Sequence, residues 1–167
     1  MGDIKDLQNT EAIEKMKEIA ENTVGHFCTF VEGASIVSRP MHTQEVDGNG
    51  NFWFFSSKDS NKNQQIQQNS KVQLLYAIDG KSEYLSIEGT ATISTDQAKI
   101  DELWSGFVKT WFTEGKHDPK LSLIEVTPTA GYYWDTKNSK MVSLIKIAAG
   151  SIIGKTMDDG IEGSLNI

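Results

Sequence analysis

The stretch EYLSIEGTATI, residues 83–93, alternates between apolar or small residues and polar ones along its whole length. Successive side chains of a β-strand point to opposite faces, so this alternation gives each face of the segment a single character. The residues on the apolar face are Leu85, Ile87, Gly89, Ala91 and Ile93. The pattern predicts a long strand with one face on a hydrophobic core and the other toward solvent, which is typical of an antiparallel sheet.

Other β-rich segments lie before and after this strand, and turn residues separate them. HFCTFV and ASIVSRPM are joined by Glu32 and Gly33, which predicts a hairpin. The remaining segments are NFWFFS (51–56), KVQLLYAI (71–78), LSLIEVTP (121–128) and AGYYWD (130–135). About six strands in this order, with helices inserted between them, predict a mainly β fold in which a small antiparallel barrel carries peripheral helices.

Several segments have the composition and spacing of helices. Apolar residues at helical spacing, with Thr10 as a cap and Gly25 beyond the end, predict an amphipathic first helix. Further helices are expected from about Ser60 to Asn69, from Asp96 to Trp104 and over residues 139–153. We expect the two ends, residues 1–9 and 154–167, to be mobile.

The length and charge of the chain limit its function. At 167 residues it suits a single domain with its own core. The formal net charge of −7 argues against a nucleic-acid partner, because such proteins neutralise phosphates with clustered basic residues. The one cysteine, Cys28, cannot form an internal disulfide, which indicates a reducing compartment. Without a signal core or an apolar run of about 20 residues, we expect a cytoplasmic protein with no membrane partner.

Serines and lysines gather where the strand at 51–56 gives way to the polar helix. Ser56, Ser57 and Ser60 offer hydroxyl groups, and Lys58 and Lys62 offer positive charge. The first N–H groups of a helix have no partner within it, and the helix dipole favours an anion at that end. The joint therefore predicts a seat for a phosphate group. A solvated surface helix with Ser60 as its N-cap is the alternative, and the spacing alone leaves it open.

The segment SRPM contains the single arginine of the chain, Arg39, followed by Pro40. Proline has no N–H for the ladder, so it restricts its strand to an edge or a bulge and leaves neighbouring backbone groups free for other contacts. A guanidinium used once favours a specific polar partner, with a surface ion pair as the alternative.

Most of the aromatic residues are expected in core or interface packing. These are Trp53, Phe54, Trp104, Phe107, Trp111 and Phe112. Trp134, near the end of a strand, is the one expected beside a ligand. The three histidines are far apart in the sequence and show no metal-binding spacing, so no metal site is expected. The glycine motifs of Rossmann and P-loop nucleotide sites and of the nucleophile elbow are absent from the sequence.

Taken in order, several segments resemble the FMN-binding split barrels related to pyridoxamine phosphate oxidase, and among them the bacterial general stress protein branch. The segments are SRPM, GNFWFFSSKDSNKNQQIQQNSKVQLLY, YLSIEGTATI, WFTEGKHDPKLSLIEV and GYYWD. The resemblance runs from Ala12 to Asp135. It implies a six-stranded antiparallel split β-barrel and a homodimer with FMN at the subunit interface. FAD is the alternative cofactor, because an adenylate can extend outward from a partly open phosphate seat.

The resemblance also implies which residues bind the flavin. The strand along the ring and the ribityl chain would be Arg39, Pro40 and Met41. The facing strand would contribute Phe55, Ser56 and Ser57. The helix start that holds the phosphate would be Ser60, Asn61 and Lys62, and Trp134 would reach the flavin of the other subunit. Asn61 stands where many relatives have a basic residue, so the phosphate would depend more on Lys62 and the backbone.

The resemblance implies an FMN-dependent oxidoreductase of unknown substrate, with a small molecule or a nicotinamide as redox partner. No side chain in the sequence stands out as catalytic. A flavin-binding, storage or sensing module without turnover is one alternative, and a structural dimer without a ligand is another. Pyridoxamine phosphate oxidation itself is not expected, because that enzyme grips its substrate with C-terminal arginines and this chain has none after Arg39.

Overall fold

The computed structural model describes residues 3–33, 36–136 and 160–166. Within them, six antiparallel strands form the barrel, in the order β6–β9–β8–β7–β3–β4. They are β3 (Val24–Thr29), β4 (Val37–His42), β6 (Phe52–Ser57), β7 (Lys71–Ile78), β8 (Glu83–Ser94) and β9 (Leu121–Thr136). This architecture confirms the mainly β, split-barrel fold that the sequence predicts.

The barrel is split between its two outermost strands. β4 lies beside β3 at one edge, and β6 lies beside β9 at the other. The two edges come into contact, yet no ladder of hydrogen bonds joins them within the described residues. Pro40 therefore lies on an edge strand, as the missing N–H predicts. The gap leaves edge backbone groups available to a ligand.

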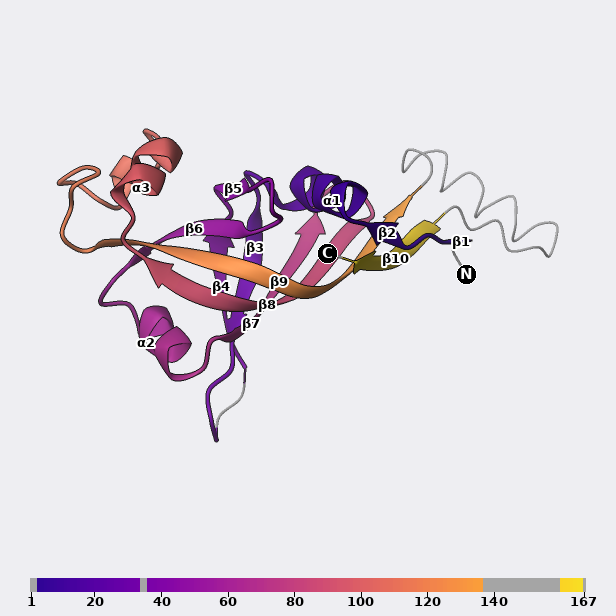
Figure 1. Cartoon of the computed structure of the whole chain (residues 1–167), viewed down its shortest axis with the longest axis horizontal. Coiled ribbons are helices and arrows are strands. Elements are labelled where there is room, and N and C mark those ends of the chain that lie inside the picture. The colour runs from indigo at the N-terminus through magenta and orange to yellow at the C-terminus, as the bar shows by residue number, and fades with distance from the viewer. Residues whose placement is uncertain (1–2, 34–35, 137–159, 167) are drawn as a thin grey trace.

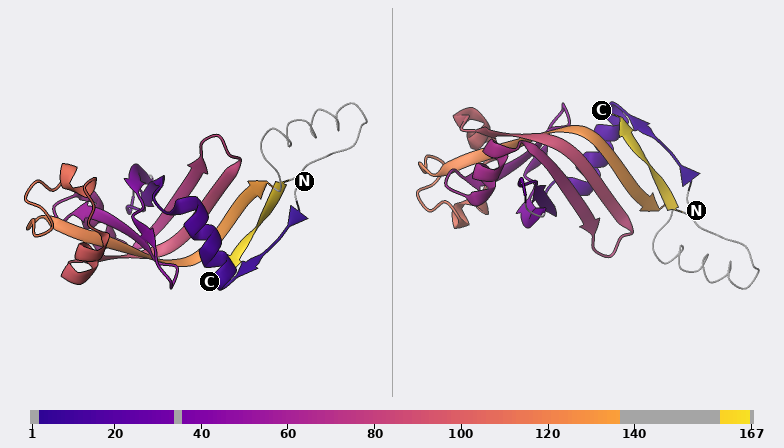
Figure 2. Two further views of the ribbon diagram at one scale, coloured as in Figure 1. Left: turned by 90° about the horizontal axis from the view of Figure 1, so that it is seen from above. Right: turned by 90° about the horizontal axis from the view of Figure 1, so that it is seen from below.

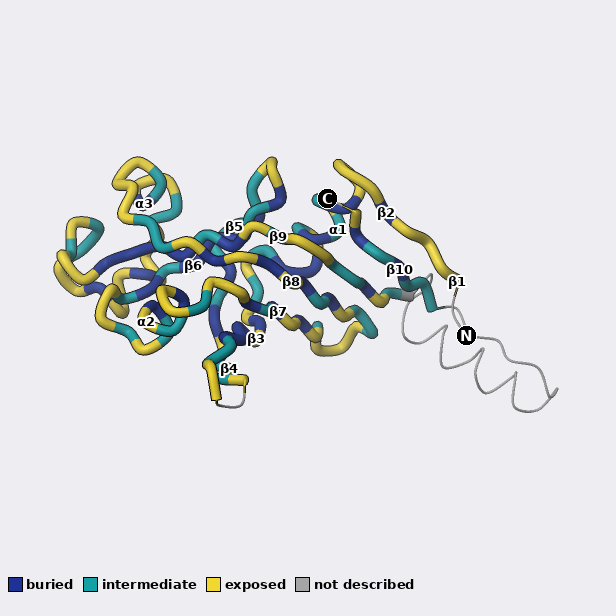
Figure 3. Tube along the Cα trace, turned by 60° about the horizontal axis from the view of Figure 1, so that its bottom comes forward, coloured by how far each residue is buried: buried dark blue, intermediate teal, exposed yellow. Residues whose placement is uncertain are grey.

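Strand β8 follows the alternation of its sequence closely. Leu85, Ile87 and Ala91 are buried in the main core, while Glu88 and Thr90 on the other face are exposed. Figure 3 shows the buried dark-blue stretches along the strands of the barrel and the exposed yellow ones in the loops. Local pattern was sufficient to predict this strand because one face meets the core and the other does not.

Strand β9 corrects the prediction of two separate strands at 121–128 and 130–135. It is continuous from Leu121 to Thr136. The register against β8 shifts between Glu88 and Gly89, which leaves an extra residue, Thr129, in β9 beside Pro128. A bulge interrupts the ladder at that point, so the proline removes no hydrogen bond that a regular ladder would need.

The structure describes parts of the two end segments, residues 3–9 and 160–166, and both contain strands, while their mobility stays a prediction. Near the N-terminus the chain forms β1 (Asp3–Ile4) and β2 (Leu7–Gln8), and near the C-terminus it forms β10 (Gly160–Asn166). β10 pairs antiparallel with the part of β9 that extends past β6, and β1 and β2 pair with β10 in parallel. Leu7 and Leu165 are buried, which anchors both ends in the core.

Helices cover the barrel at separate places (Figures 1 and 2). They are α1 (Thr10–Ala20), α2 (Asn61–Gln68), α3 (Gln97–Leu103) and the 3-10 turn η1 (Val108–Thr110). α1 packs Met16 and Ile19 into the main core near the short strand β5 (Glu45–Val46). All three α-helices match predicted segments, although Thr10 opens α1 without capping it. The predicted helix at 139–153 lies outside the described residues.

A second, smaller core lies under α3 and η1. It consists of Trp53, Ile100, Val108, Phe112, Leu121 and Leu123. This core fixes the segment around η1 beside the edge strand β6, which is the side of the barrel where the split opens. In the described part of the chain, no helix is long and apolar enough to cross a bilayer.

Candidate functional site

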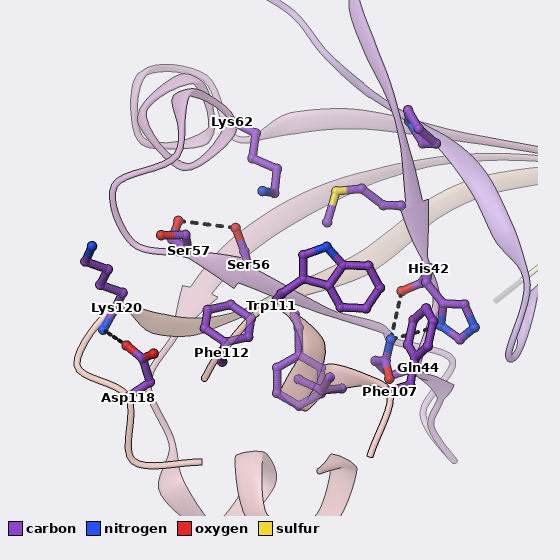
Figure 4. A pocket seen from close by; sticks show the side chains of 14 residues that line it. His42, Gln44, Ser56, Ser57, Lys62, Phe107, Trp111, Phe112, Asp118 and Lys120 are labelled. Carbon is purple, nitrogen blue, oxygen red and sulfur yellow. Dashed lines mark hydrogen bonds between the residues drawn. The ribbon is translucent and has the colours of Figure 1, made fainter. Parts of the chain in front are cut away.

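A cleft of about 430 Å³ lies at the split between β4 and β6. Figure 4 shows its walls, which come from both edge strands, the start of α2, and the segment from η1 to the loop before β9. The volume falls in the range of small-molecule sites. The strand residues that line it are Pro40, Met41, His42, Phe55, Ser56 and Ser57. The structure thus brings the two predicted strand groups together, with Arg39 just outside the lining.

The joint between β6 and α2 is fixed by a buried hydrogen-bond network around Asn63. The Ser56 hydroxyl donates to Asn63 Oδ1 at 2.6 Å, and the Ser60 hydroxyl lies 3.1 Å from the same oxygen. Asn63 Nδ2 donates to Ser122 Oγ at 3.1 Å, and that hydroxyl donates to the Ser56 carbonyl at 3.0 Å. The network ties the helix to two strands and aims the first turn of α2 at the cleft.

The three serines of the joint, Ser56, Ser57 and Ser60, have different roles in this network. Ser60 is the N-cap of α2, because its hydroxyl accepts from the Asn63 N–H at 3.3 Å. Ser56 and Ser60 donate their hydroxyl protons to Asn63 Oδ1, so these protons hold the joint in place and do not point to a ligand in the cleft. Ser57 lines the cleft, and its hydroxyl makes no hydrogen bond to any described residue. It is the serine whose hydroxyl proton stays available to a ligand.

Backbone donors reinforce the seat at the start of α2. The N–H groups of Asn61 and Lys62 are among the first of the helix and make no hydrogen bond within the described chain. Such groups, together with the helix dipole, attract an anion. Asn61 itself is exposed and does not line the cleft, so its contribution is the backbone N–H.

Lys62 is the cation of the cleft. Figure 4 shows its side chain reaching in from α2, over the side of the cleft that holds Ser56 and Ser57. It is half-buried, and it forms no ion pair or hydrogen bond with the described residues. Burial, and then the nearby Arg39 guanidinium, lower the pKa of the Lys62 amine below its usual range. An anion in the cleft would offset both effects.

Arg39 has the specific polar partners that its single use predicted. Its guanidinium donates to Gln65 Oε1 at 2.8 Å and to Thr29 Oγ1 at 2.9 Å, with a longer bond of 3.3 Å to the Phe27 carbonyl. These contacts tie the edge strand β4 to α2. All of these acceptors are neutral, so the positive charge of Arg39 adds to that of Lys62. The cleft lining also contains an acid, Asp118, whose carboxylate accepts from the Lys120 backbone N–H at 2.9 Å and forms no ion pair with either cation.

The opposite side of the cleft is aromatic. Phe107 and Trp111 are 53% and 62% exposed, and their ring centroids are 4.6 Å apart in an edge-to-face arrangement. The His42 ring lies beside the Phe107 ring, with the two centroids 5.3 Å apart. Its Nδ1 is 2.9 Å from the Gln44 amide nitrogen. Burial lowers the pKa of His42, so the imidazole is neutral at pH 7.

The predicted core aromatics separate into two groups. Trp53, Phe54 and Phe112 are buried, which confirms that part of the prediction. Phe107 and Trp111 line the cleft and are largely exposed, so they do not pack in the core, and interface packing stays a prediction for them. Val108 and Phe112 occupy the second core, and the rings next to them in the sequence, Phe107 and Trp111, lie outside it.

Trp134 lies away from the cleft of its own chain. It is 40% exposed on the outer face of the sheet, opposite Tyr84 on β8. With Leu75 and His26 these rings border a second hollow of about 590 Å³ that is largely apolar. Within one chain, Trp134 is therefore the one predicted site residue that the fold does not bring near the others.

Sequence reasoning missed several residues of the cleft. Asn63 falls three residues after the capping Ser60, a spacing that could have indicated it. Ser122 carried no signal, since it is 59 residues from Asn63 in the sequence. Lys120 lines the cleft only because the loop before β9 returns beside Ser57. Among the described residues, no group of three His, Cys, Asp or Glu side chains could hold a metal ion.

Comparison with known proteins gives a consistent result. Residues 11–158 match the family model described as pyridoxamine 5'-phosphate oxidase like. The structure resembles a candidate general stress protein 26 from Jannaschia sp. CCS1, with a TM-score of 0.73 and 25% identity over 94% of this chain and 96% of that one. It also resembles the general stress FMN/FAD binding protein of Xanthomonas citri, with a TM-score of 0.64 and 27% identity over 78% and 90% of the two chains.

A curated relative is more distant. Protein bli-3 of Neurospora crassa is 22% identical in an alignment of 129 residues that covers 72% of this chain and 62% of that protein. The chain thus spans less than two thirds of the length of this relative.

Proposed function

Because the chain belongs to the pyridoxamine 5'-phosphate oxidase-like family, we propose that it is a flavoprotein that binds FMN in the cleft between β4 and β6. Lys62 is the observation that carries the proposal. A half-buried ammonium beside an arginine, which forms no ion pair with any described acid, favours an anion in the cleft. The similarity to an FMN/FAD binding protein of Xanthomonas citri supports a flavin phosphate as that anion.

The residues of the joint suit a terminal phosphate. Lys62 supplies a charge-assisted hydrogen bond, Ser57 a hydroxyl proton, and the N–H groups of Asn61 and Lys62 the backbone donors. Ser56, Ser60 and Asn63 keep these donors in place through their own hydrogen bonds. Arg39 braces β4 against α2 and adds positive potential.

The rest of the flavin would lie along the edge strands. Pro40 and Met41 of β4 face Phe55 of β6 across the cleft, and an apolar wall of this kind suits a ribityl chain and a ring. A bound flavin supplies hydride and electron transfer. The chain supplies binding, orientation and exclusion of water. FAD is the second ligand of the same seat, with its adenylate directed outward past the exposed lysines Lys58 and Lys120.

We further propose that the protein acts as a homodimer. The outer face of the sheet exposes Leu75, Tyr84 and Trp134, which a second copy would cover, and the Trp134 of that copy would reach the flavin. Trp134→Asp should then produce monomers in sedimentation equilibrium and weaken FMN binding. Ile4→Asp, at an apolar residue that is 71% exposed on β1, is the control. Unchanged association of the Trp134 variant would refute the proposed interface.

Among flavoprotein roles, we propose a flavin-dependent oxidoreductase that takes electrons from a nicotinamide. The first test is to denature the purified protein and chromatograph the supernatant, which should contain FMN. The second is anaerobic mixing of the flavin-loaded protein with NADH or NADPH, which should bleach the flavin absorbance. A flavin that stays oxidised would refute the oxidoreductase and favour a binding or storage role. A protein that takes up no flavin would refute flavin binding as well.

A further inference from the structure

We propose that Trp111, supported by Phe107, is the wall on which the isoalloxazine ring of the flavin stacks. This inference rests on the proposed function, since it concerns the ligand of the same cleft. It adds a residue that lies 43 positions after the end of α2, outside the segments that the sequence predicted for the site. Trp111 would then be a cofactor-binding residue contributed by the segment around η1.

The first reason is that the backbone of Trp111 is held in place while its side chain is exposed. The Trp111 N–H donates to the Val108 carbonyl at 3.0 Å, and Val108 and Phe112 on either side are buried in the second core. The Trp111 ring is nevertheless 62% exposed. Large apolar side chains held outward on an anchored turn are costly to leave in water, and a planar partner would cover them.

The second reason is the geometry of the two rings. Phe107 meets the Trp111 ring edge to face at 4.6 Å, an arrangement that holds the indole in one orientation and leaves a face open. In Figure 4 the Trp111 indole lies in the middle of the cleft, between Lys62 on one side and Phe107 with His42 on the other. The open face is therefore presented to the cleft.

The third reason is the separation of charge and apolar surface. Lys62 lies at the α2 side with Arg39 behind it, and the exposed rings lie at the η1 side. The other charged residues of the lining, Lys120 and Asp118, lie on the side of Ser57 in Figure 4. A flavin mononucleotide has the same division, with a dianion at one end of the ribityl chain and a planar ring at the other. A phosphate at Lys62 therefore directs the ring toward Trp111.

The test separates the ring from the phosphate by titrating the flavin-free full chain with FMN and with riboflavin, which lacks the phosphate. Trp111→Ala should weaken both ligands by a similar factor of about 5–10, because the lost contact is with the ring. Trp111→Phe should keep most of the affinity. Trp104→Phe is the matched control, because Trp104 packs against Phe55 at 6.1 Å outside the cleft and should leave both affinities unchanged.

Flavin fluorescence gives a readout that does not depend on turnover. An indole stacked on the ring quenches flavin emission by electron transfer, and Trp134→Phe removes the other indole that we place near the flavin. In the Trp134→Phe protein, FMN should lose most of its emission on binding, and it should recover much of it when Trp111→Phe is added. Equal quenching in the two proteins, or unchanged affinity of Trp111→Ala for both ligands, would overturn the inference while FMN binding by the wild type stood. Failure of the wild type to bind FMN would remove the proposed function as well.

Melting and sedimentation measurements distinguish the loss of a stacking contact from a loss of affinity caused by misfolding or by a changed assembly. The variants should melt within a few degrees of the wild type, as expected for a side chain that is 62% exposed. They should also keep its sedimentation behaviour. A Trp111→Ala protein that became monomeric would assign the ring to a subunit contact and overturn the stacking role.

Discussion

The side chain of Asn63 joins three parts of the chain at one point. It bonds Ser56 at the end of β6, Ser60 at the cap of α2 and Ser122 on β9, and it is almost completely buried. A sequence shows the local part of this arrangement, because Ser60 precedes a polar helix by the spacing of a cap. It does not show Ser122, whose position depends on the pairing of β6 with β9.

Removing that side chain should destabilise the protein. Asn63→Ala removes the acceptor of the Ser56 hydroxyl and the donor to Ser122 Oγ in a buried site, and we expect it to lower the free energy of unfolding by about 2–4 kcal/mol. Urea unfolding followed by circular dichroism measures this. Gln64→Ala, at the exposed neighbouring position, should change the same quantity by less than about 0.5 kcal/mol. Equal losses in the two variants would show that the network is not structural.

The lowered pKa of Lys62 gives a pH dependence with a definite sign. The amine is charged well below that pKa and loses its charge as the pH rises through it, so the phosphate loses its cation. FMN affinity should therefore be nearly constant below the pKa of the amine and fall as the pH rises through it. Titrations at a series of pH values measure this, and riboflavin over the same range corrects for ionisation of the ring. Lys62→Met should abolish the dependence, so a slope that persists in it would assign the effect to another group.

At the scale of elements, sequence pattern predicted what each segment does alone. The alternation in β8 and the periodicity of α1 depend on one buried face, and both were predicted. The continuity of β9 and the pairing of β1, β2 and β10 were not, because they depend on strands from distant parts of the chain lying side by side. The orientation of Phe107 and Trp111 was missed for a similar reason, since Val108 and Phe112 occupy the core in their place.

The bulge between β8 and β9 offers a test at this scale. A Cβ added to Gly89 would lie 2.7 Å from the Thr127 carbonyl oxygen and 2.8 Å from Val126 Cγ1. Gly89→Ala should therefore cost about 1–3 kcal/mol of stability by forcing the strands apart. Gly106→Ala is the control, because nothing lies within 4 Å of the added carbon. Thermal unfolding compares the two, and equal midpoints would mean that the strands accommodate the methyl group at no cost.

At the scale of the whole molecule, the split in the barrel positions the site. The two edge strands approach without pairing, and the cleft that they leave is closed by the start of α2 on one side and by η1 on the other. The sequence predicted both strands and the helix start, and the structure brings them to one cleft. The aromatic side was not, because a 3-10 turn held by a second core has no clear signature in the sequence.

The central claim is that the joint of β6 and α2 binds the phosphate of a flavin. Calorimetric titration of the flavin-free full chain with FMN and with riboflavin, in the wild type, Lys62→Ala and Lys58→Ala, tests it most directly. The wild type and Lys58→Ala should prefer FMN, and Lys62→Ala should lose about 1.5–3 kcal/mol of that preference, since a charge-assisted hydrogen bond is removed. Equal affinity of the wild type for the two ligands, or an undiminished preference in Lys62→Ala, would contradict the claim.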